Sequence, residues 1–73
     1  MILSKGKQVL TKKTLSTIRG PIMPGAEGII RDWDDMGSIY VAFLQPFACY
    51  LDCRNEDIIE KYPEHNDILK GLL

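Results

Sequence analysis

Residues 39–44 constrain the fold more than any other segment of the chain. Their side chains alternate with a period of two, so that Ile39, Val41 and Phe43 share one face of an extended strand and the other three residues share the opposite face. Both faces are apolar. The pattern therefore predicts a central strand, covered on one side by the core and on the other by a loop, the C-terminal segment or a partner.

A turn and a second strand precede this segment. Pro24 and Gly25 are typical of a turn corner, because Pro fixes φ and Gly accepts a positive φ. Gly28 indicates a close backbone approach or a bulge where the strand at 29–33 begins. Residues 34–37, Asp-Asp-Met-Gly, predict a tight turn, since Asp folds its side chain onto the backbone and Gly accepts the left-handed conformation. Together these signals predict a β-hairpin.

The N-terminal segments predict a strand followed by a loop. In residues 4–13, lysines flank Val9 and Leu10, which favours a strand with one wet face on which one of these two side chains points inward. Lysines along such a strand would also protect a sheet edge from pairing with another chain. In residues 14–23, Gly and Pro separate isolated apolar residues, which predicts a long loop without regular structure.

Three short elements are expected after the hairpin. Pro46 interrupts the strand pattern because it lacks a backbone donor, and residues 48–51 predict a fourth strand. The polar residues 52–57 predict a turn with one turn of 3₁₀ helix. Residues 58–59 then predict a brief final strand.

The C-terminal segment, residues 63–73, carries a helical pattern. Four apolar residues fall on one helical stripe, and acidic residues stand near its N-terminal end, where the helix dipole favours them. The stripe consists of Ile68, Leu69, Leu72 and Leu73. A helix this short is not stable alone, so we expect it to dock on something.

The whole pattern predicts one mainly β domain. A chain of 73 residues buries only about 60% of its unfolded surface, which suits a single thin core. Five short strands, a long first loop and a 3₁₀ turn before the last strand are typical of a small antiparallel barrel. We expect a five-stranded barrel over about residues 5–62 and a short C-terminal helix over residues 63–73.

The chain resembles the SH3-like barrel superfamily, in particular its bacterial and KOW-type small barrels. The matching segments are residues 5–9, 24–30, 37–43 and 55–59. The resemblance covers about residues 5–60 and rests on short motifs of common residue types. It implies a barrel that binds proteins or nucleic acid, often as an accessory subunit, without implying an activity. Signalling SH3 domains carry a tyrosine pair in the first loop and a tryptophan pair opening the third strand, whereas this first loop has no aromatic residue and the only tryptophan, Trp33, ends the second strand.

Cysteine spacing and hydropathy predict a reduced, cytoplasmic protein. Cys49 and Cys53 lie four residues apart in an extended segment, which separates their Cα atoms by roughly 13 Å, too far for a disulfide. We expect both to be buried small hydrophobes. The sequence shows no export leader, and its longest apolar run is far shorter than the roughly 20 residues that span a bilayer, which predicts no membrane contact.

Catalytic and metal-binding patterns are weak. Catalysis needs at least a base with a nucleophile, or two converging carboxylates, and His65 is the only histidine. Two cysteines and one histidine fall short of the four ligands of a structural zinc site. Asp32, Asp34 and Asp35 crowd one turn but lack the later Glu of a calcium loop. We therefore predict no enzymatic activity, no cofactor and no metal.

Charge divides the chain into a basic front and an acidic rear. Residues 1–31 carry six basic residues against Glu27, and residues 32–73 carry three basic residues against nine acidic ones. A nucleic-acid or ribonucleoprotein binder of the KOW type would use the basic front to neutralise phosphates. Its candidate residues are Lys5, Lys7, Lys12, Lys13, Arg19 and Arg31. The overall pI of about 5.7 disfavours this alternative.

Protein binding is the function that the sequence favours. Large apolar side chains beside turns and flanked by charge are the usual anchors of contact surfaces. The candidate residues are Trp33, Asp34, Asp35, Met36, Tyr40 and Phe47, with Tyr50 as a further aromatic candidate. The alternative for Trp33 and Phe47 is that they close the two ends of a thin core. We expect an adaptor, an inhibitor or an accessory subunit that binds another protein or a second copy of itself.

Overall fold

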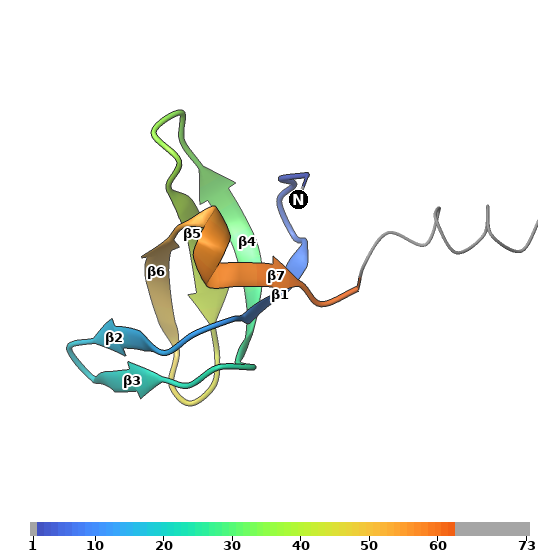
Figure 1. Cartoon of the computed structure of the whole chain (residues 1–73). Helices are drawn as coiled ribbons and strands as arrows, with labels where there is room; N and C mark the ends of the chain where they lie inside the picture. Colours follow the sequence, from blue (N-terminus) through green and yellow to red (C-terminus); the bar gives the residue numbers. More distant parts are fainter. Residues whose placement is uncertain (1, 63–73) are drawn as a thin grey trace, which may run out of the picture.

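The computed structural model describes residues 2–62, which form seven β-strands and one 3₁₀ helix (Figure 1). Five strands form an antiparallel sheet in the spatial order β6-β5-β4-β1-β7, and β2 pairs with β3 in a separate two-stranded sheet. The elements are β1 (Gln8–Thr11), β2 (Leu15–Thr17), β3 (Gly20–Ile22), β4 (Glu27–Trp33), β5 (Ile39–Phe43), β6 (Cys49–Cys53), η1 (Asn55–Asp57) and β7 (Ile58–Glu60). The mainly β prediction is confirmed.

Strand β5 is central, as its alternating apolar pattern predicts, because it pairs with β4 on one side and β6 on the other. The β4–β5 turn follows the expected chemistry. Gly37 has a φ of 91°, and Asp34 accepts hydrogen bonds from the turn backbone. Gly25 has a φ of 88°, as expected for the corner before β4.

Gly28 provides the close approach that its position indicates. A Cβ atom on Gly28 would lie 2.5 Å from Val41 Cγ1 and 2.9 Å from Phe43 Cε1. These distances are shorter than van der Waals contact, so a glycine at this position of β4 leaves the space that the inward side chains of Val41 and Phe43 occupy. The β-bulge lies elsewhere, between Ile30 and Asp32.

The core lies on the inward face of the five-stranded sheet. Val9 points inward and Leu10 is only half-buried, which decides the orientation of β1. The buried hydrophobic residues are Val9, Ile22, Ile30, Ile39, Val41, Phe43, Cys53 and Ile58. They come from β1 and from β3 to β7, so that the small sheet contributes to the same core as the large one.

Strand β1 lies inside the sheet, between β4 and β7, and the interpretation of its lysines as protectors of an edge is wrong. Thr11, at its end, fixes the turn that leads into β4. Its hydroxyl donates to the Met23 carbonyl at 2.9 Å and accepts the Ala26 N–H at 3.0 Å, while its carbonyl accepts the Gly25 N–H at 2.8 Å. These bonds satisfy a buried polar side chain and the backbone of the turn.

The segment predicted as an irregular loop, residues 14–23, forms the β2–β3 hairpin instead. The Thr17 hydroxyl closes its turn by donating to the Gly20 carbonyl at 2.7 Å and accepting the Arg19 N–H at 3.1 Å. Pro21 is tolerated because a two-stranded sheet leaves one side of each strand without a backbone partner. Ile22 is fully buried and Leu15 packs against the core, which anchors the hairpin.

The last elements agree closely with the predicted ones. Cys49 and Cys53 begin and end β6, and both are free thiols. The 3₁₀ helix η1 leads directly into β7, and the Arg54 N–H donates to the Asp57 carboxylate at 2.8 Å. Over residues 2–62 no backbone pairing joins the edge strands β6 and β7. The predicted C-terminal helix, residues 63–73, lies outside the described residues.

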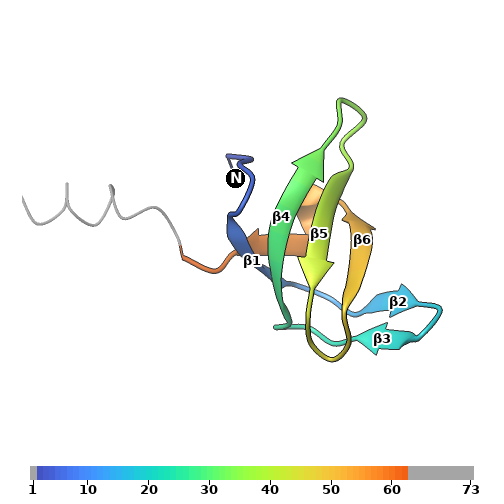
Figure 2. The same cartoon turned by 180° about the vertical axis from the view of Figure 1, so that it is seen from behind.

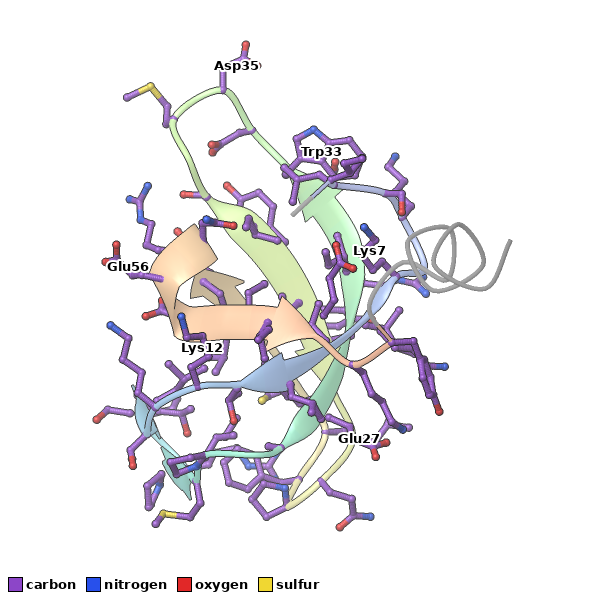
Figure 3. All side chains as sticks on the ribbon, turned by 45° about the vertical axis from the view of Figure 1, so that its right-hand side comes forward. Lys7, Lys12, Glu27, Trp33, Asp35 and Glu56 are labelled. Atoms are coloured by element: carbon purple, nitrogen blue, oxygen red, sulfur yellow. The ribbon has the colours of Figure 1, made fainter. Side chains whose placement is uncertain are left out.

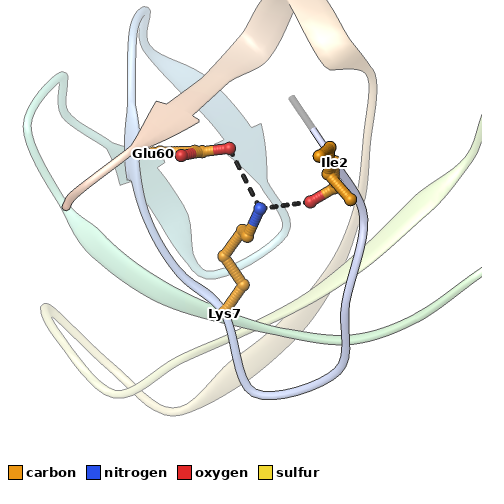
Figure 4. Close-up of polar contacts among 3 residues, drawn as sticks. All are labelled: Ile2, Lys7 and Glu60. Carbon is orange, nitrogen blue, oxygen red and sulfur yellow. Dashed lines mark hydrogen bonds and ion pairs between the residues drawn. The ribbon is translucent and has the colours of Figure 1, made fainter. Parts of the chain in front are cut away.

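One ion pair closes an end of the core. Lys7 Nζ lies 3.0 Å from Glu60 Oε1 and also donates to the Ile2 carbonyl (Figure 4). Both charged side chains are mostly shielded, with 19% and 16% of their surface exposed. The pair therefore ties the N-terminal segment to β7 at the edge of the sheet.

Candidate functional site

Strands β4, β5 and β6 lie side by side in the sheet (Figure 2), and the exposed side chains on the outward face of these strands include Ile29, Tyr40 and Tyr50. The strand register places Ile29 opposite Ala42 and Ala42 opposite Tyr50, so these residues form one row across three strands. Tyr40 and Leu44 stand on either side of Ala42 along the chain. We define the outward face as Ile29, Tyr40, Ala42, Leu44 and Tyr50.

The large side chains of the outward face are accessible. The exposed fractions are 76% for Leu44, 74% for Tyr50, 38% for Tyr40 and 37% for Ile29. Isolated exposed apolar residues are normal, whereas large contiguous apolar patches on monomers are often interaction sites. Over residues 2–62, nothing covers the second apolar face that the sequence pattern indicates for β5.

A groove of about 890 Å³ hollows this face. Its lining includes Ala42 and Ile29, which are paired on β5 and β4, and Gln8 of β1. The turn before β4 forms one wall, the loop after β5 forms another, and the chain after β7 forms a third. The wall residues include Met23, Pro24, Leu44, Pro46, Lys61 and Tyr62.

The groove rim carries one ion pair. Lys61 Nζ lies 2.7 Å from Glu27 Oε1, and this hydrogen bond raises the pKa of Lys61 above its ordinary value. The Lys61 N–H donates to the Gln8 carbonyl at 3.0 Å. The chain is thereby held against β1 as it reaches the groove.

The β4–β5 turn fixes one end of the outward face. Asp34 Oδ1 accepts the Met36 N–H at 2.8 Å and the Ser38 N–H at 3.1 Å, and Oδ2 accepts the Tyr40 hydroxyl at 3.0 Å. The bond from the Ser38 backbone is the main cause of the lowered pKa of Asp34. The pKa of Tyr40 is raised by its bond to the same carboxylate. Asp34 thus holds both the turn and the ring of Tyr40.

The other predicted turn residues are divided. Asp35 stands at the exposed tip of the turn (Figure 3), and Met36 beside it is 81% exposed. Trp33 is half-buried against the core, because the bulge at Arg31 shifts the alternation of β4 by one residue and pairs Trp33 with the inward-facing Ile39. Trp33 therefore closes one end of the core, one of the two interpretations that its sequence position allows.

The β5–β6 loop lies at the opposite end of β5 from the β4–β5 turn (Figure 1). Phe47 belongs to this loop and also packs against the core. The Arg19 guanidinium lies 5.0 Å from the centroid of its ring, and Arg19 Nη1 donates to the Ala48 carbonyl at 3.1 Å. These contacts tie the β2–β3 hairpin to the loop. The structure thus places five of the predicted contact residues at or beside the β4–β5 turn and Phe47 at the other end of β5. The five are Trp33, Asp34, Asp35, Met36 and Tyr40.

The outward face adds three residues to the contact residues predicted from the sequence, namely Ile29, Ala42 and Leu44. The sequence signal for Ala42 and Leu44 is that residues 39–44 are apolar on both faces, and the burial of Ile39, Val41 and Phe43 makes the other face the outward one. Ile29 lies outside this segment and joins the face because it pairs with Ala42. Tyr50 is a candidate on its sequence alone, and its position opposite Ala42 places it in the same row.

The six basic residues of the alternative site are dispersed. Lys7 and Lys12 flank the two ends of β1 (Figure 3). Lys7 is paired with Glu60, Lys13 Nζ lies 3.2 Å from Asp57 Oδ1, and Arg19 binds the β5–β6 loop. The remaining three residues are exposed: Lys5 in the turn before β1, Lys12 directly after β1 and Arg31 on β4. Half of the set is therefore engaged in contacts within the protein.

The buried cysteine, Cys53, has little nucleophilic character. Burial raises the pKa of Cys53 to about 12, which keeps its thiol protonated at neutral pH. Cys49 is only half-buried, so the prediction of two buried cysteines holds for Cys53 alone. Across residues 2–62 no group of three or more His, Cys, Asp or Glu side chains could hold a metal ion. His65 lies outside the described residues.

No family model, no curated protein and no solved structure matches this chain. Within residues 2–62 there is also no helix with the length and apolar character needed to cross a lipid bilayer. The functional inference therefore depends on the geometry of the outward face alone.

Proposed function

We propose that this chain is a small non-enzymatic module with an SH3-like barrel fold that binds another protein through the outward face. The order of its elements supports the fold: a first strand, a long hairpin, three consecutive antiparallel strands, a 3₁₀ turn and a last strand that pairs with the first. A barrel of this kind hosts many functions, so the function is inferred from the face and not from the fold.

One observation carries the proposal, the apolar row formed by exposed Ile29, half-buried Ala42 and exposed Tyr50, with exposed Tyr40 and Leu44 beside it. Tyrosines are among the residues that contribute most to binding when they become buried, because they combine a large apolar area with a polar group and few rotatable bonds. The Asp34 bond restrains Tyr40 in advance, so less side-chain entropy is lost when a partner binds.

The charges next to the face indicate the chemistry of the partner. Asp32 and Asp52 flank Tyr40 on the two neighbouring strands, and Asp35 stands at the tip of the adjoining turn. These carboxylates favour a partner with Lys or Arg at this end and apolar groups over the groove. The protein would act as an adaptor, an inhibitor or an accessory subunit.

Affinity capture from the native cell tests the proposal. The full chain is immobilised beside a variant with Leu44→Ser and Tyr50→Ser, and a matched control with Ile18→Ser removes a fully exposed apolar residue from the β2–β3 turn, away from the face. We expect a stoichiometric protein partner with the natural chain and the control, and at least tenfold less with the double variant, which corresponds to about 1.4 kcal/mol. Equal capture by all three chains would contradict the proposed surface.

The nucleic-acid alternative is tested separately. The purified protein is titrated with mixed DNA and RNA at low and then moderate salt, with Lys12→Glu and Lys13→Glu as the comparison. The proposal predicts no binding that depends steeply on salt and on these two residues. Such binding would replace it with phosphate recognition through the basic front.

A further inference from the structure

We propose that the groove in the outward face is occupied by the chain's own residues 63–73, with the apolar stripe Ile68, Leu69, Leu72 and Leu73 covering Ile29, Ala42 and Leu44. The tail, residues 63–73, would thus act as an intramolecular competitor of the partner. The docking itself is a property of the isolated chain, and only the competition depends on the proposed function.

The first support is the position at which the described chain ends. Lys61 and Tyr62 form part of the groove wall, and Lys61 is held beside Gln8 of β1 by a backbone hydrogen bond of 3.0 Å. The described residues therefore end at the groove itself, which is the place from which a docking tail would have to start.

The second support is length. Neighbouring strands lie about 4.8 Å apart, so β4 and β5 are reached within roughly 10 to 14 Å of the chain that leaves β7. The five residues 63–67 separate Tyr62 from the apolar stripe. Five residues span at most about 17 Å when fully extended. The stripe can therefore reach Ile29 and Ala42 in the groove.

The third support is complementarity. The tail has four large aliphatic residues within six positions, and the groove is lined by the apolar side chains of Ile29 and Ala42 and bordered by exposed Leu44 and Met23. A short amphipathic segment has little stability alone but becomes stable when its apolar side lies in such a groove.

Tethering favours this occupant over a second copy. A segment joined by a short linker has an effective concentration in the millimolar range at its own groove. A second chain at micromolar concentration competes poorly with it for the same residues. A separate protein must then bind the face more tightly than the tail does, or displace it.

Nuclear magnetic resonance on the full chain tests the contact. We expect methyl NOEs between Leu69 or Leu72 and the groove residues Ile29 and Ala42. These NOEs should arise within one chain. In an isotope-filtered experiment on a mixture of labelled and unlabelled chains, we therefore expect no NOE between chains. Intermolecular NOEs would assign the groove to a second copy, and the absence of any tail NOE would leave it open to a separate partner. Either outcome overturns the proposal.

Matched variants strengthen the test. Leu69→Asp with Leu72→Asp changes the net charge as much as Lys70→Asp does, but only the first disrupts the stripe. We expect the methyl signals of Ile29, Ala42 and Leu44 to shift in the double variant and to stay in place with Lys70→Asp, while the signals of buried Val41 report that the fold is intact. Identical spectra for both variants would contradict docking.

The competition is tested by repeating the affinity capture with these two variants. We expect the double variant to retain several-fold more partner than the natural chain, because the competing segment no longer reduces the accessible fraction of the face. If no chain captures a partner while the tail NOEs are present, the proposed function fails and the docking stands. If a partner is captured and no tail NOE is seen, the docking fails and the proposed function stands.

Discussion

The two faces of β5 have similar composition and opposite environments. The inward residues Val41 and Phe43 are 0% and 1% exposed, whereas the outward Tyr40 and the adjoining Leu44 are 38% and 76% exposed. The inward residues share one core with residues from both sheets. In the described part of the chain, residues 2–62, the outward Tyr40 and Leu44 are exposed to solvent. Apolar character alone therefore does not place a side chain in the core, and the surplus apolar face is where an external contact is expected.

The comparison is tested most strongly by truncating one side chain on each face. Phe43→Ala should destabilise the fold by about 3 to 4 kcal/mol, because it removes a buried ring and leaves a cavity in a thin core. Leu44→Ala should cost no more than about 1 kcal/mol, because its side chain is exposed in the described residues and only the proposed contact with residues 63–73 would cover it. Urea denaturation followed by circular dichroism measures both. Similar losses would mean that the outward face is buried as completely as the core, which would contradict the difference between the two faces.

A methyl group added to the inward side of β4 gives the next largest effect. Gly28→Ala would place its Cβ against Val41 and Phe43 at less than contact distance, and we expect a loss of about 1 to 3 kcal/mol from overpacking. Ala42→Ser on the outward side is the control and should be nearly neutral. The same denaturation experiment measures the two variants, and an unchanged midpoint for Gly28→Ala would show that β5 moves away without cost.

The two lysine–glutamate pairs extend the comparison to charged groups. Lys7 and Glu60 are shielded at the inward side, whereas Glu27 of the pair with Lys61 is largely exposed. Glu60→Gln should cost about 1 to 2 kcal/mol, because Lys7 is left with a poorer partner in a site that water reaches only in part. Glu27→Gln should produce no measurable loss. The urea denaturation midpoints of Glu60→Gln and Glu27→Gln are compared, and the lower midpoint is expected for Glu60→Gln.

The smallest effect concerns the turn that holds Tyr40. The pKa of Asp34 is lowered in the folded protein, so its contribution to stability is present above the unfolded pKa of about 3.9 and is lost as pH falls through the lower folded value. Stability should decline below about pH 4, and Asp34→Asn should reduce that decline. Spectroscopic titration of Tyr40 in the same variant should show its raised pKa moving back toward the ordinary value. An unaltered Tyr40 titration would contradict the Asp34 bond.

Most strands could be predicted from the sequence because their signals are local. The alternation in residues 39–44, the turn residues Gly25 and Gly37, and the polar 3₁₀ segment before β7 each act within a few positions. The β2–β3 hairpin could not be predicted in this way. Gly20 and Pro21 are loop signals, and burial of Ile22 against distant strands outweighs them.

The candidate site was predictable only in part. The alternation of β5, the turn at Asp34 and the apolar character of both faces of residues 39–44 follow from the sequence alone. Which face of β5 lies inside depends on tertiary packing, and the directions of the β4 side chains depend on register: the bulge at Arg31 turns Trp33 toward the core and Asp32 outward. A shift of one residue reverses the direction of every following side chain, and the register of the pairing with β5, which no local pattern specifies, fixes that shift.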